Sequence, residues 1–201
     1  EVPDEIRTLI GQIQDRNKFL LKITECLLEI YRYESGGKDM DFSNVDTRKL
    51  VDEVTADFKK AAADKKITLH CIAEDSMPKV FADEKALKLL IAHLIDNAIK
   101  YGAEGSSIQV RQEDDGEDVI LEVTNTGSFI DEESRKVLFD KFWRGQPGKR
   151  FVANTGLGLY LCKRIVDAHG GIIECQSNED TVTTFKVTLP IAKQAKVSLT
   201  T

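Results

Sequence analysis

The sequence predicts an α+β fold: a two-layer α/β sandwich in which a mixed sheet carries helices on one face, preceded by a long N-terminal helix. Residues 4–33 show the apolar spacing of one helix, and the rest of the chain alternates helical patterns with short strand patterns. Asp114-Asp115-Gly116, between two alternating runs, is a strong hairpin signal, so part of the sheet is expected to be antiparallel.

The N-terminal helix carries apolar residues at spacings of three, four and seven, with charged residues between them. Such a narrow seam suits a contact with one other helix or within a bundle. The helix is expected to end before Gly36-Gly37, because glycine supplies the backbone freedom that a helix end needs. The seam consists of Leu9 or Ile10, Ile13, Leu20, Ile23, Leu27 and Ile30.

This helix end is the expected domain boundary, with a partial first domain over 1–36, a second domain over 37–192 and a frayed tail over 193–201. The elements expected in the second domain alternate between helices with inward apolar stripes and short strands. In order, they are a helix capped by Asp46, strands over 67–73 and 79–82, a helix capped by Asp83, strands over 108–113 and 119–124, a short helix over 131–139, a helix over 157–169, and strands over 172–176 and 184–189.

Size and charge indicate a folded acidic domain. The 201 residues are 41% hydrophobic and 31% charged, which is enough for a core and a soluble surface. The net charge of -6 argues against a nucleic-acid-binding chain, which usually presents a basic face. No apolar run is long enough to cross a bilayer, so membrane attachment would come only from upstream segments.

The four cysteines form no C-x-x-C pair, and each lies in an apolar or alternating stretch. Buried, reduced thiols in a cytoplasmic protein are therefore expected in preference to a zinc site or a disulfide framework. These residues are Cys26, Cys71, Cys162 and Cys175.

Gly156-Leu157-Gly158 opens a predicted helix and has two interpretations. The amides of a first helical turn attract anions, so the segment can be a phosphate cradle. It can equally be a tight turn that allows close packing. The P-loop is excluded because the G-K-[ST] ending is absent, and the dinucleotide fingerprint because no strand precedes the segment.

Four motifs in a fixed order resemble the catalytic domain of two-component sensor histidine kinases. Residues 93–101 resemble the N-box, Asn125-Thr126-Gly127 the G1 box, residues 138–145 the F-box and residues 155–159 the G2 box. The resemblance implies the Bergerat ATP-binding fold shared by gyrase, Hsp90, MutL and the histidine kinases, with ATP and Mg²⁺ as cofactors.

The resemblance also assigns roles to the N-box and G1 residues. Asn97 matches the asparagine that coordinates the Mg²⁺ bridging the ATP phosphates, an ion that takes most of its charge from phosphate. Lys100 and Tyr101 match phosphate-contacting neighbours, although Lys100 can also be a solvated surface lysine. Asn125 and Gly127 match the loop that recognises adenine.

The remaining binding residues implied by the resemblance belong to the G2 box and the ATP lid. The amides at the start of the last helix would hold phosphates, and lid cations would steady the γ-phosphate, with an ordinary solvated loop as the alternative for each cation. The G2 residues are Thr155, Gly156, Leu157, Gly158 and Leu159, and the lid cations are Arg144, Lys149 and Arg150. Phe139, Phe142 and Trp143 are expected to anchor the lid.

Four residues depart from the family pattern. Asn125 replaces the aspartate that, in the family, accepts a hydrogen bond from the adenine amino group. The affinity for ATP is therefore expected to fall roughly five- to tenfold. Ser128 and Phe129 replace the usual G-x-G ending. His93 stands where ATPases carry an acidic base, which favours a kinase over a gyrase-like ATPase. His93 is expected to pack in the helix, with contact to a Mg²⁺-bound water as the alternative.

No histidine has the H-box context of a phosphoacceptor, and residues 17–36 instead resemble the second helix of the dimerisation and phosphotransfer domain. The resemblance therefore implies an acceptor histidine upstream, a homodimer through these helices, and a response regulator receiver domain as partner. The chain alone is expected to bind Mg-ATP without autophosphorylation. A degenerate docking module without nucleotide turnover, a Bergerat ATPase and a protein serine kinase remain the alternatives.

Overall fold

The computed structural model describes residues 3–34, 40–74, 76–145 and 155–191. Its helices and strands have the following bounds. The helices are α1 (Asp4–Glu34), α2 (Thr47–Asp64), α3 (Glu84–Tyr101), α4 (Glu132–Val137) and α5 (Gly158–Ala168). The strands are β1 (Phe42–Val45), β2 (Thr68–Ala73), β3 (Val80–Asp83), β4 (Ser107–Asp114), β5 (Asp118–Thr126), β6 (Ile172–Ser177) and β7 (Val182–Pro190).

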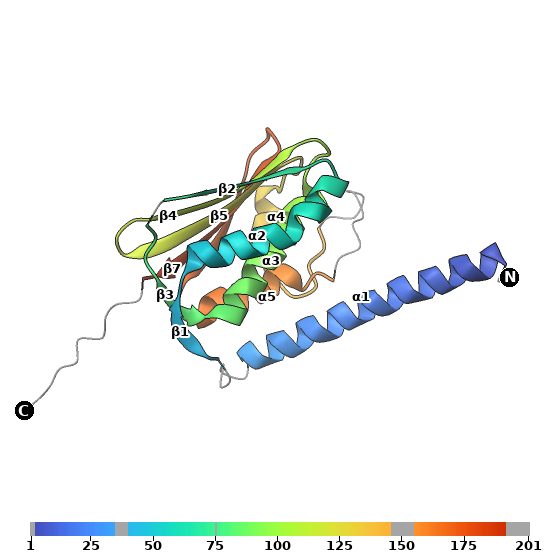
Figure 1. The fold of residues 1–201 in the computed structure, drawn as a ribbon, viewed down its shortest axis with the longest axis horizontal. Coiled ribbons are helices and arrows are strands. Elements are labelled where there is room, and N and C mark those ends of the chain that lie inside the picture. Colours follow the sequence, from blue (N-terminus) through green and yellow to red (C-terminus); the bar gives the residue numbers. More distant parts are fainter. Residues whose placement is uncertain (1–2, 35–39, 75, 146–154, 192–201) are drawn as a thin grey trace, which may run out of the picture.

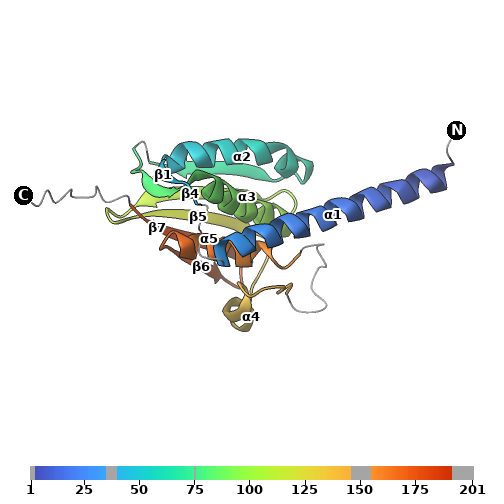
Figure 2. The ribbon, with the colours of Figure 1, turned by 90° about the horizontal axis from the view of Figure 1, so that it is seen from below.

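The main sheet is mixed and has five strands in the order β2-β4-β5-β7-β6. Only the β2–β4 pair is parallel, and the other three pairs are antiparallel. Helices α2, α3 and α5 cover one face of this sheet, as Figures 1 and 2 show. The predicted two-layer sandwich with helices on one face is therefore confirmed.

The predicted helix caps and the predicted hairpin turn are present in the structure. Asp46 and Asp83 each accept a hydrogen bond from a first-turn amide, 3.0 Å long in both helices, which satisfies a donor that the helix leaves unpaired. In the β4–β5 hairpin, Gly116 has φ +90° and the Asp115 carboxylate accepts the amides of Glu117 and Asp118.

The core lies between the sheet and the helix layer. The predicted apolar stripe of α3 is buried throughout, because its residues recur at helical spacing on the face toward β5. The stripe consists of Leu87, Leu90, Ile91, Leu94, Ile95 and Ala98.

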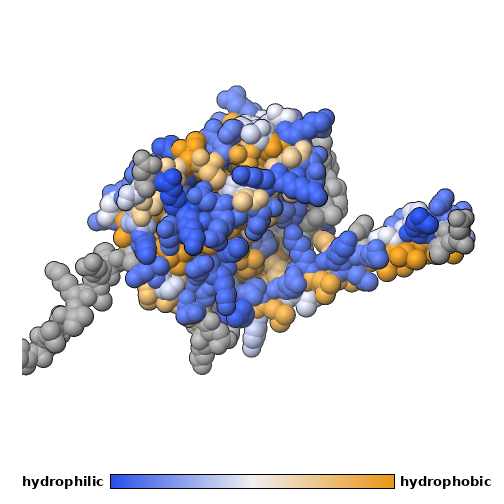
Figure 3. All heavy atoms as spheres, viewed as in Figure 1, coloured by the Kyte–Doolittle hydropathy of each residue, from blue (hydrophilic) through white to orange (hydrophobic). Residues whose placement is uncertain are grey.

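Helix α1 contacts α5 at its C-terminal end, while its N-terminal half extends away from the sandwich (Figures 1 and 2). The expected seam is largely exposed: Leu9, Ile13 and Leu20 are all at least half exposed, and Leu27 is also exposed. Figure 3 shows apolar side chains along one side of α1. Among the seam residues, Ile30 packs into the core instead.

Two expectations need correction. Residues 42–45 form a strand, β1, which pairs antiparallel with β3 in a separate two-stranded sheet and which the sequence pattern did not indicate. The expectation that all four cysteines are buried is wrong for Cys71, which is exposed because β2 is an edge strand that the helix layer covers only in part. Cys26 and Cys162 are buried, Cys175 is half-buried, and all four are free thiols.

The expected boundaries at 36 and 192 and the tail at 193–201 lie outside the described residues. Within the described ranges, no helix combines the length and the apolar character that a membrane span requires.

Candidate functional site

The C-terminal half of α3 presents Asn97, Lys100 and Tyr101, the first of the predicted site residues. All three are part-buried at the end of a helix whose opposite face is anchored in the core. The Asn97 side chain makes no hydrogen bond to any residue that the structure describes. Its amide oxygen is therefore available to a hard cation such as Mg²⁺, which prefers oxygen ligands.

Asp96, next to Asn97, is a residue that the sequence analysis did not single out. Its Oδ2 accepts hydrogen bonds from Lys100 Nζ at 2.6 Å and from Lys22 Nζ of α1 at 3.1 Å. Burial opposes ionisation of Asp96, but the two ammonium groups outweigh it and hold the pKa of the carboxyl below its usual value. Lys100 thus has a definite partner in this state and is not a solvated surface lysine.

His93 lies one turn before Asn97 and faces the start of α5. A β-carbon at Gly158 would lie 3.4 Å from His93 Nδ1, so the ring packs directly against the first residue of α5. Burial, together with the nearby charge of Lys22, lowers the pKa of His93 to about 4. The imidazole is therefore neutral near pH 7, which supports the packing interpretation of this residue.

Asn125 is the penultimate residue of the central strand β5 and is 2% exposed. Its Nδ2 donates to Ser128 Oγ at 3.1 Å, and Thr183 Oγ1 donates to the Ser128 carbonyl at 2.9 Å. Ser177 joins the same group through a 2.8 Å contact with Thr183 Oγ1. These hydroxyls hold the turn that the sequence analysis expected to differ from the family pattern, and they fix the Asn125 side chain.

Gly127 brings this turn against the end of α3. Its φ is +110°, and a β-carbon there would meet the Ala103 amide nitrogen at 2.4 Å. The Ala103 amide donates to the Thr126 carbonyl at 2.8 Å. Only glycine fits this position, because it combines a left-handed backbone with backbone-to-backbone packing. The Asn125 turn and the N-box are therefore joined directly.

Gly156 makes the corresponding contact with the F-box segment. Its φ is +67°, and a β-carbon there would lie 2.7 Å from the Phe142 carbonyl carbon. The Phe142 amide donates to the Gly156 carbonyl at 2.9 Å. The G2 and F-box segments are therefore fixed to each other, although residues 146–154 separate them in the chain.

Helix α5 begins at Gly158, and its N-cap residue, Leu157, makes no side-chain capping hydrogen bond. Thr155 Oγ1 accepts the Leu157 amide at 3.2 Å, and Leu157 is fully buried, which fixes the direction in which the helix starts. Leu159 and Gly158 are part-buried. An uncapped first turn carries partial positive charge and is suited to an anion.

The predicted lid residues divide into three groups. Phe139 and Trp143 pack against the core, with Phe139 edge-on to Phe185, whereas Phe142 is 61% exposed. Arg144 is exposed at the end of the described segment. Lys149 and Arg150 lie outside the described residues.

The C-terminal end of α1 also reaches this region. The Glu34 carboxylate accepts from Tyr160 Oη of α5 at 2.5 Å and from Lys141 Nζ of the F-box at 2.6 Å. Lys141 in turn lies 5.0 Å from the centre of the Tyr160 ring. Lys22, Asp96 and Glu34 could not be predicted as site residues, since no local pattern in the sequence indicates that α1 folds back onto this site.

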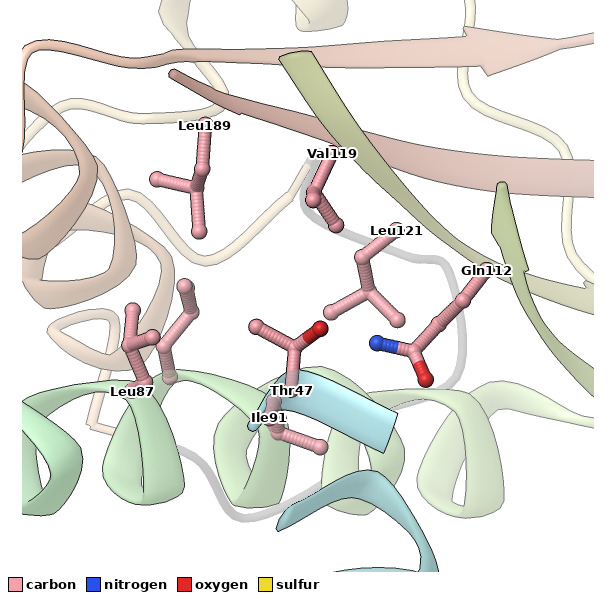
Figure 4. A pocket seen from close by; sticks show the side chains of 8 residues that line it. Thr47, Leu87, Ile91, Gln112, Val119, Leu121 and Leu189 are labelled. Carbon is pink, nitrogen blue, oxygen red and sulfur yellow. The ribbon is translucent and has the colours of Figure 1, made fainter. Parts of the chain in front are cut away.

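A small pocket elsewhere in the chain does not suit a nucleotide (Figure 4). It is lined mainly by apolar side chains and lies beside Leu87, Leu90 and Ile91. Leu87 precedes Asn97 by about three turns, or roughly 15 Å along the helix. Within the described residues, the buried Thr47 Oγ1 and Gln112 Oε1 that line it have no hydrogen-bond partner.

Comparison with known proteins identifies the family of the chain. Residues 82–193 match the model of the family "Histidine kinase-, DNA gyrase B-, and HSP90-like ATPase", which is more than half of the chain. The chain belongs to this family. The match spans every segment of the site except α1 and therefore confirms the resemblance on which the site residues were proposed.

Among curated proteins, the sensor protein SrrB of Staphylococcus aureus is 28% identical over 190 residues, which is 94% of this chain and 32% of that protein. The chain thus spans about a third of the length of the curated relatives it matches.

Solved structures show the same fold. Full-length ShkA in complex with AMPPNP superposes with a TM-score of 0.82 at 22% identity, covering 96% of this chain and 40% of that one. The catalytic domain of the histidine kinase ThkA gives 0.67 at 28% identity, covering 76% and 97%. ThkA in complex with the response regulator TrrA gives 0.76 at 25% identity, covering 95% and 53%.

Proposed function

We propose that this chain is the Mg-ATP-binding catalytic part of a sensor histidine kinase. The observation that carries the proposal is the convergence of segments far apart in the sequence on the end of α3. Gly127 packs on Ala103, Gly158 packs on His93, and Gly156 packs on Phe142. The Gly158 contact places the start of α5 against α3 one turn before Asn97, and the Gly127 contact places the Asn125 turn just after the end of α3. The Gly156 contact joins the F-box segment to the start of α5.

The residues fit the cofactors that the family implies. Asn97 would hold Mg²⁺, and no cluster of three or more His, Cys, Asp or Glu suited to a metal occurs among the described residues. Most of the ligands would therefore be phosphate and water, as Mg²⁺ prefers. When bound, the ion neutralises charge that develops on the transferred phosphoryl group. Lys100, Tyr101 and the amides at Gly156–Leu159 would orient the phosphates.

The proposed reaction is transfer of the γ-phosphoryl of ATP to a histidine of the intact protein, and then to an aspartate of a response regulator. ThkA was solved with its regulator TrrA, which supports a receiver domain as partner. Helix α1 would belong to the dimerisation domain of a cytoplasmic homodimeric unit, because its apolar seam is exposed and suits a bundle.

His93 favours this kinase over an ATPase. An ATPase needs a base that activates water, but the pKa of His93 is lowered by burial and its ring packs against Gly158. Asn125, with its neutral amide, is the observation that favours the second candidate, a docking module that no longer turns over nucleotide.

The fate of labelled γ-phosphate distinguishes these functions. Incubated with Mg-ATP, the chain should release phosphate slowly and gain no acid-labile label. A longer form of the protein that includes the upstream histidine should gain acid-labile label and pass it to a receiver domain. Rapid steady phosphate release would indicate an ATPase, and acid-stable label on a partner serine would indicate a serine kinase.

A further inference from the structure

Helix α1 touches the rest of the protein along one narrow face. Lys22, Cys26, Ile30 and Glu34 follow one another at four-residue intervals, so they share one side of the helix. The two middle residues are buried, at 6% and 2% exposure, and the two outer residues form ion pairs. We call these four residues the docking face of α1.

One end of the docking face meets the site at a single atom. Asp96 Oδ2 accepts from Lys22 of α1 and from Lys100 of α3 at the same time, at 3.1 and 2.6 Å. The Asp96 side chain is only 25% exposed, and Lys100 only 27%, so water replaces a lost partner poorly at both. The ionised Asp96 carboxylate is therefore stabilised by the ammonium groups of Lys22 and Lys100.

We propose that Asp96 is a positioning residue that couples the docking of α1 to phosphate binding by Lys100. This inference rests on the proposed function, in which Lys100 contacts the nucleotide phosphates. When Lys100 turns to phosphate, Asp96 gives up its shorter ion pair, and Lys22 remains as its cation. Without Lys22, the same movement leaves a part-buried carboxylate without a charged partner, which is unfavourable.

The coupling is reciprocal. A docked α1 makes the movement of Lys100 easier and so raises the affinity for nucleotide. Bound nucleotide removes Lys100 from Asp96 and so strengthens the pair between Asp96 and Lys22. By linkage, each event must favour the other by the same factor.

A double-mutant cycle on the whole chain tests the coupling, with a fluorescent ATP analogue and Mg²⁺ as the probe. Lys22→Met should weaken binding about two- to fivefold, the range expected for a part-exposed ion pair. In an Asp96→Asn background, the same Lys22→Met change should have no effect, because a neutral amide does not need the second lysine.

Lys18→Met is the matched control, since it removes the same charge from the same helix one turn earlier and should leave binding unchanged. If Lys22→Met weakens binding equally in both backgrounds, it acts through its general charge and the proposal is wrong. No effect of Lys22→Met in the wild-type background also overturns it. Failure of the wild-type chain to bind the analogue contradicts the proposed function itself, which separates the two results.

Hydrogen exchange gives a second readout that loss of local packing would not mimic. Saturating Mg-ATP should slow exchange of the α1 amides around Cys26 in the wild-type chain, and Lys22→Met should abolish that difference. Equal protection by nucleotide in both proteins would contradict the coupling.

Discussion

Gly156 and Phe142 are packed backbone to backbone: a β-carbon on Gly156 would lie 2.7 Å from the Phe142 carbonyl carbon. Both residues adopt positive φ, +67° and +65°, and the Phe142 amide donates to the Gly156 carbonyl. Phenylalanine is rarely found in this conformation, so the surrounding contacts must impose it. The position of the first turn of α5 therefore depends on the F-box segment.

Replacing Gly156 by alanine should displace this turn. We expect nucleotide affinity to fall by tenfold or more and the free energy of unfolding to fall by about 2 kcal/mol, because the β-carbon adds overlap to an unfavourable φ. Gly170→Ala is the matched control: Gly170 has φ +68°, but a β-carbon there would meet no atom within 4 Å. It should lose about 1 kcal/mol and bind nucleotide normally. Equal nucleotide affinities in the two variants would show that the Gly156–Phe142 contact does not shape the site.

Restoring a carboxylate at Asn125 should strengthen nucleotide binding. Asn125→Asp changes the amide to a charged acceptor, and the Ser128 hydroxyl that now accepts from Asn125 can donate to it instead. We expect affinity for an ATP analogue to rise about five- to tenfold, and affinity for the inosine analogue, which has an accepting carbonyl oxygen in place of the amino group, not to rise. A parallel gain for both nucleotides would place Asn125 away from the adenine amino group.

Stability should fall between pH 6.5 and pH 5. Burial lowers the pKa of His93 to about 4 and also lowers the pKa of His169. Folding thus disfavours protonation of both histidines, whereas the histidines of the unfolded chain take up protons below their ordinary pKa of about 6.5. Their contribution is complete above that pH, and His93 alone should lose about 2 kcal/mol by pH 5.

Urea unfolding at several pH values between 5 and 7.5 measures this effect. The lowered pKa values of the Asp83 and Asp96 carboxyls act below this window, where unfolded aspartates begin to protonate. His93→Gln should reduce the slope and leave the part due to His169. An unchanged slope in that variant would mean that His93 is accessible to protons in the folded chain.

The pocket beside the N-terminal half of α3 should tolerate apolar replacement. Thr47 Oγ1 and Gln112 Oε1 are buried there without partners among the described residues, and the Gln112 side chain extends into the pocket (Figure 4). Thr47→Val and Gln112→Met should each raise the free energy of unfolding by about 1 kcal/mol. Thr183→Val, which removes a buried hydroxyl bonded to Ser128, should lower it by a similar amount. A loss of stability in Thr47→Val would reveal a bound partner in the pocket.

The sequence predicted those parts of the fold that depend on short-range chemistry. Asp46 and Asp83 indicated helix starts, Gly116 indicated a hairpin, and the α3 stripe indicated its buried face, since each signal acts within a few residues. Strand β1 was not predicted because its four residues alternate too weakly, and the strand depends on its pairing with the distant strand β3.

The residues of the site likewise divide into those that short sequence patterns indicate and those that depend on tertiary contacts. The motif residues Asn97, Asn125 and Gly156 were found from local spacing and family resemblance. The contacts of Lys22 with Asp96 and of Glu34 with Tyr160 join residues 74 and 126 positions apart, and exposed lysines and glutamates on a long helix look alike in sequence. Which of them make contact depends on how α1 docks.

Equilibrium titration with a fluorescent ATP analogue, with and without Mg²⁺ and beside Asn97→Ala, tests the central claim most directly. The account predicts saturable binding that requires Mg²⁺ and is lost in Asn97→Ala, while the variant unfolds at the same urea concentration as the parent chain. Absence of binding up to millimolar nucleotide, or binding that Asn97→Ala leaves intact, would contradict the account and favour a docking module that does not use ATP.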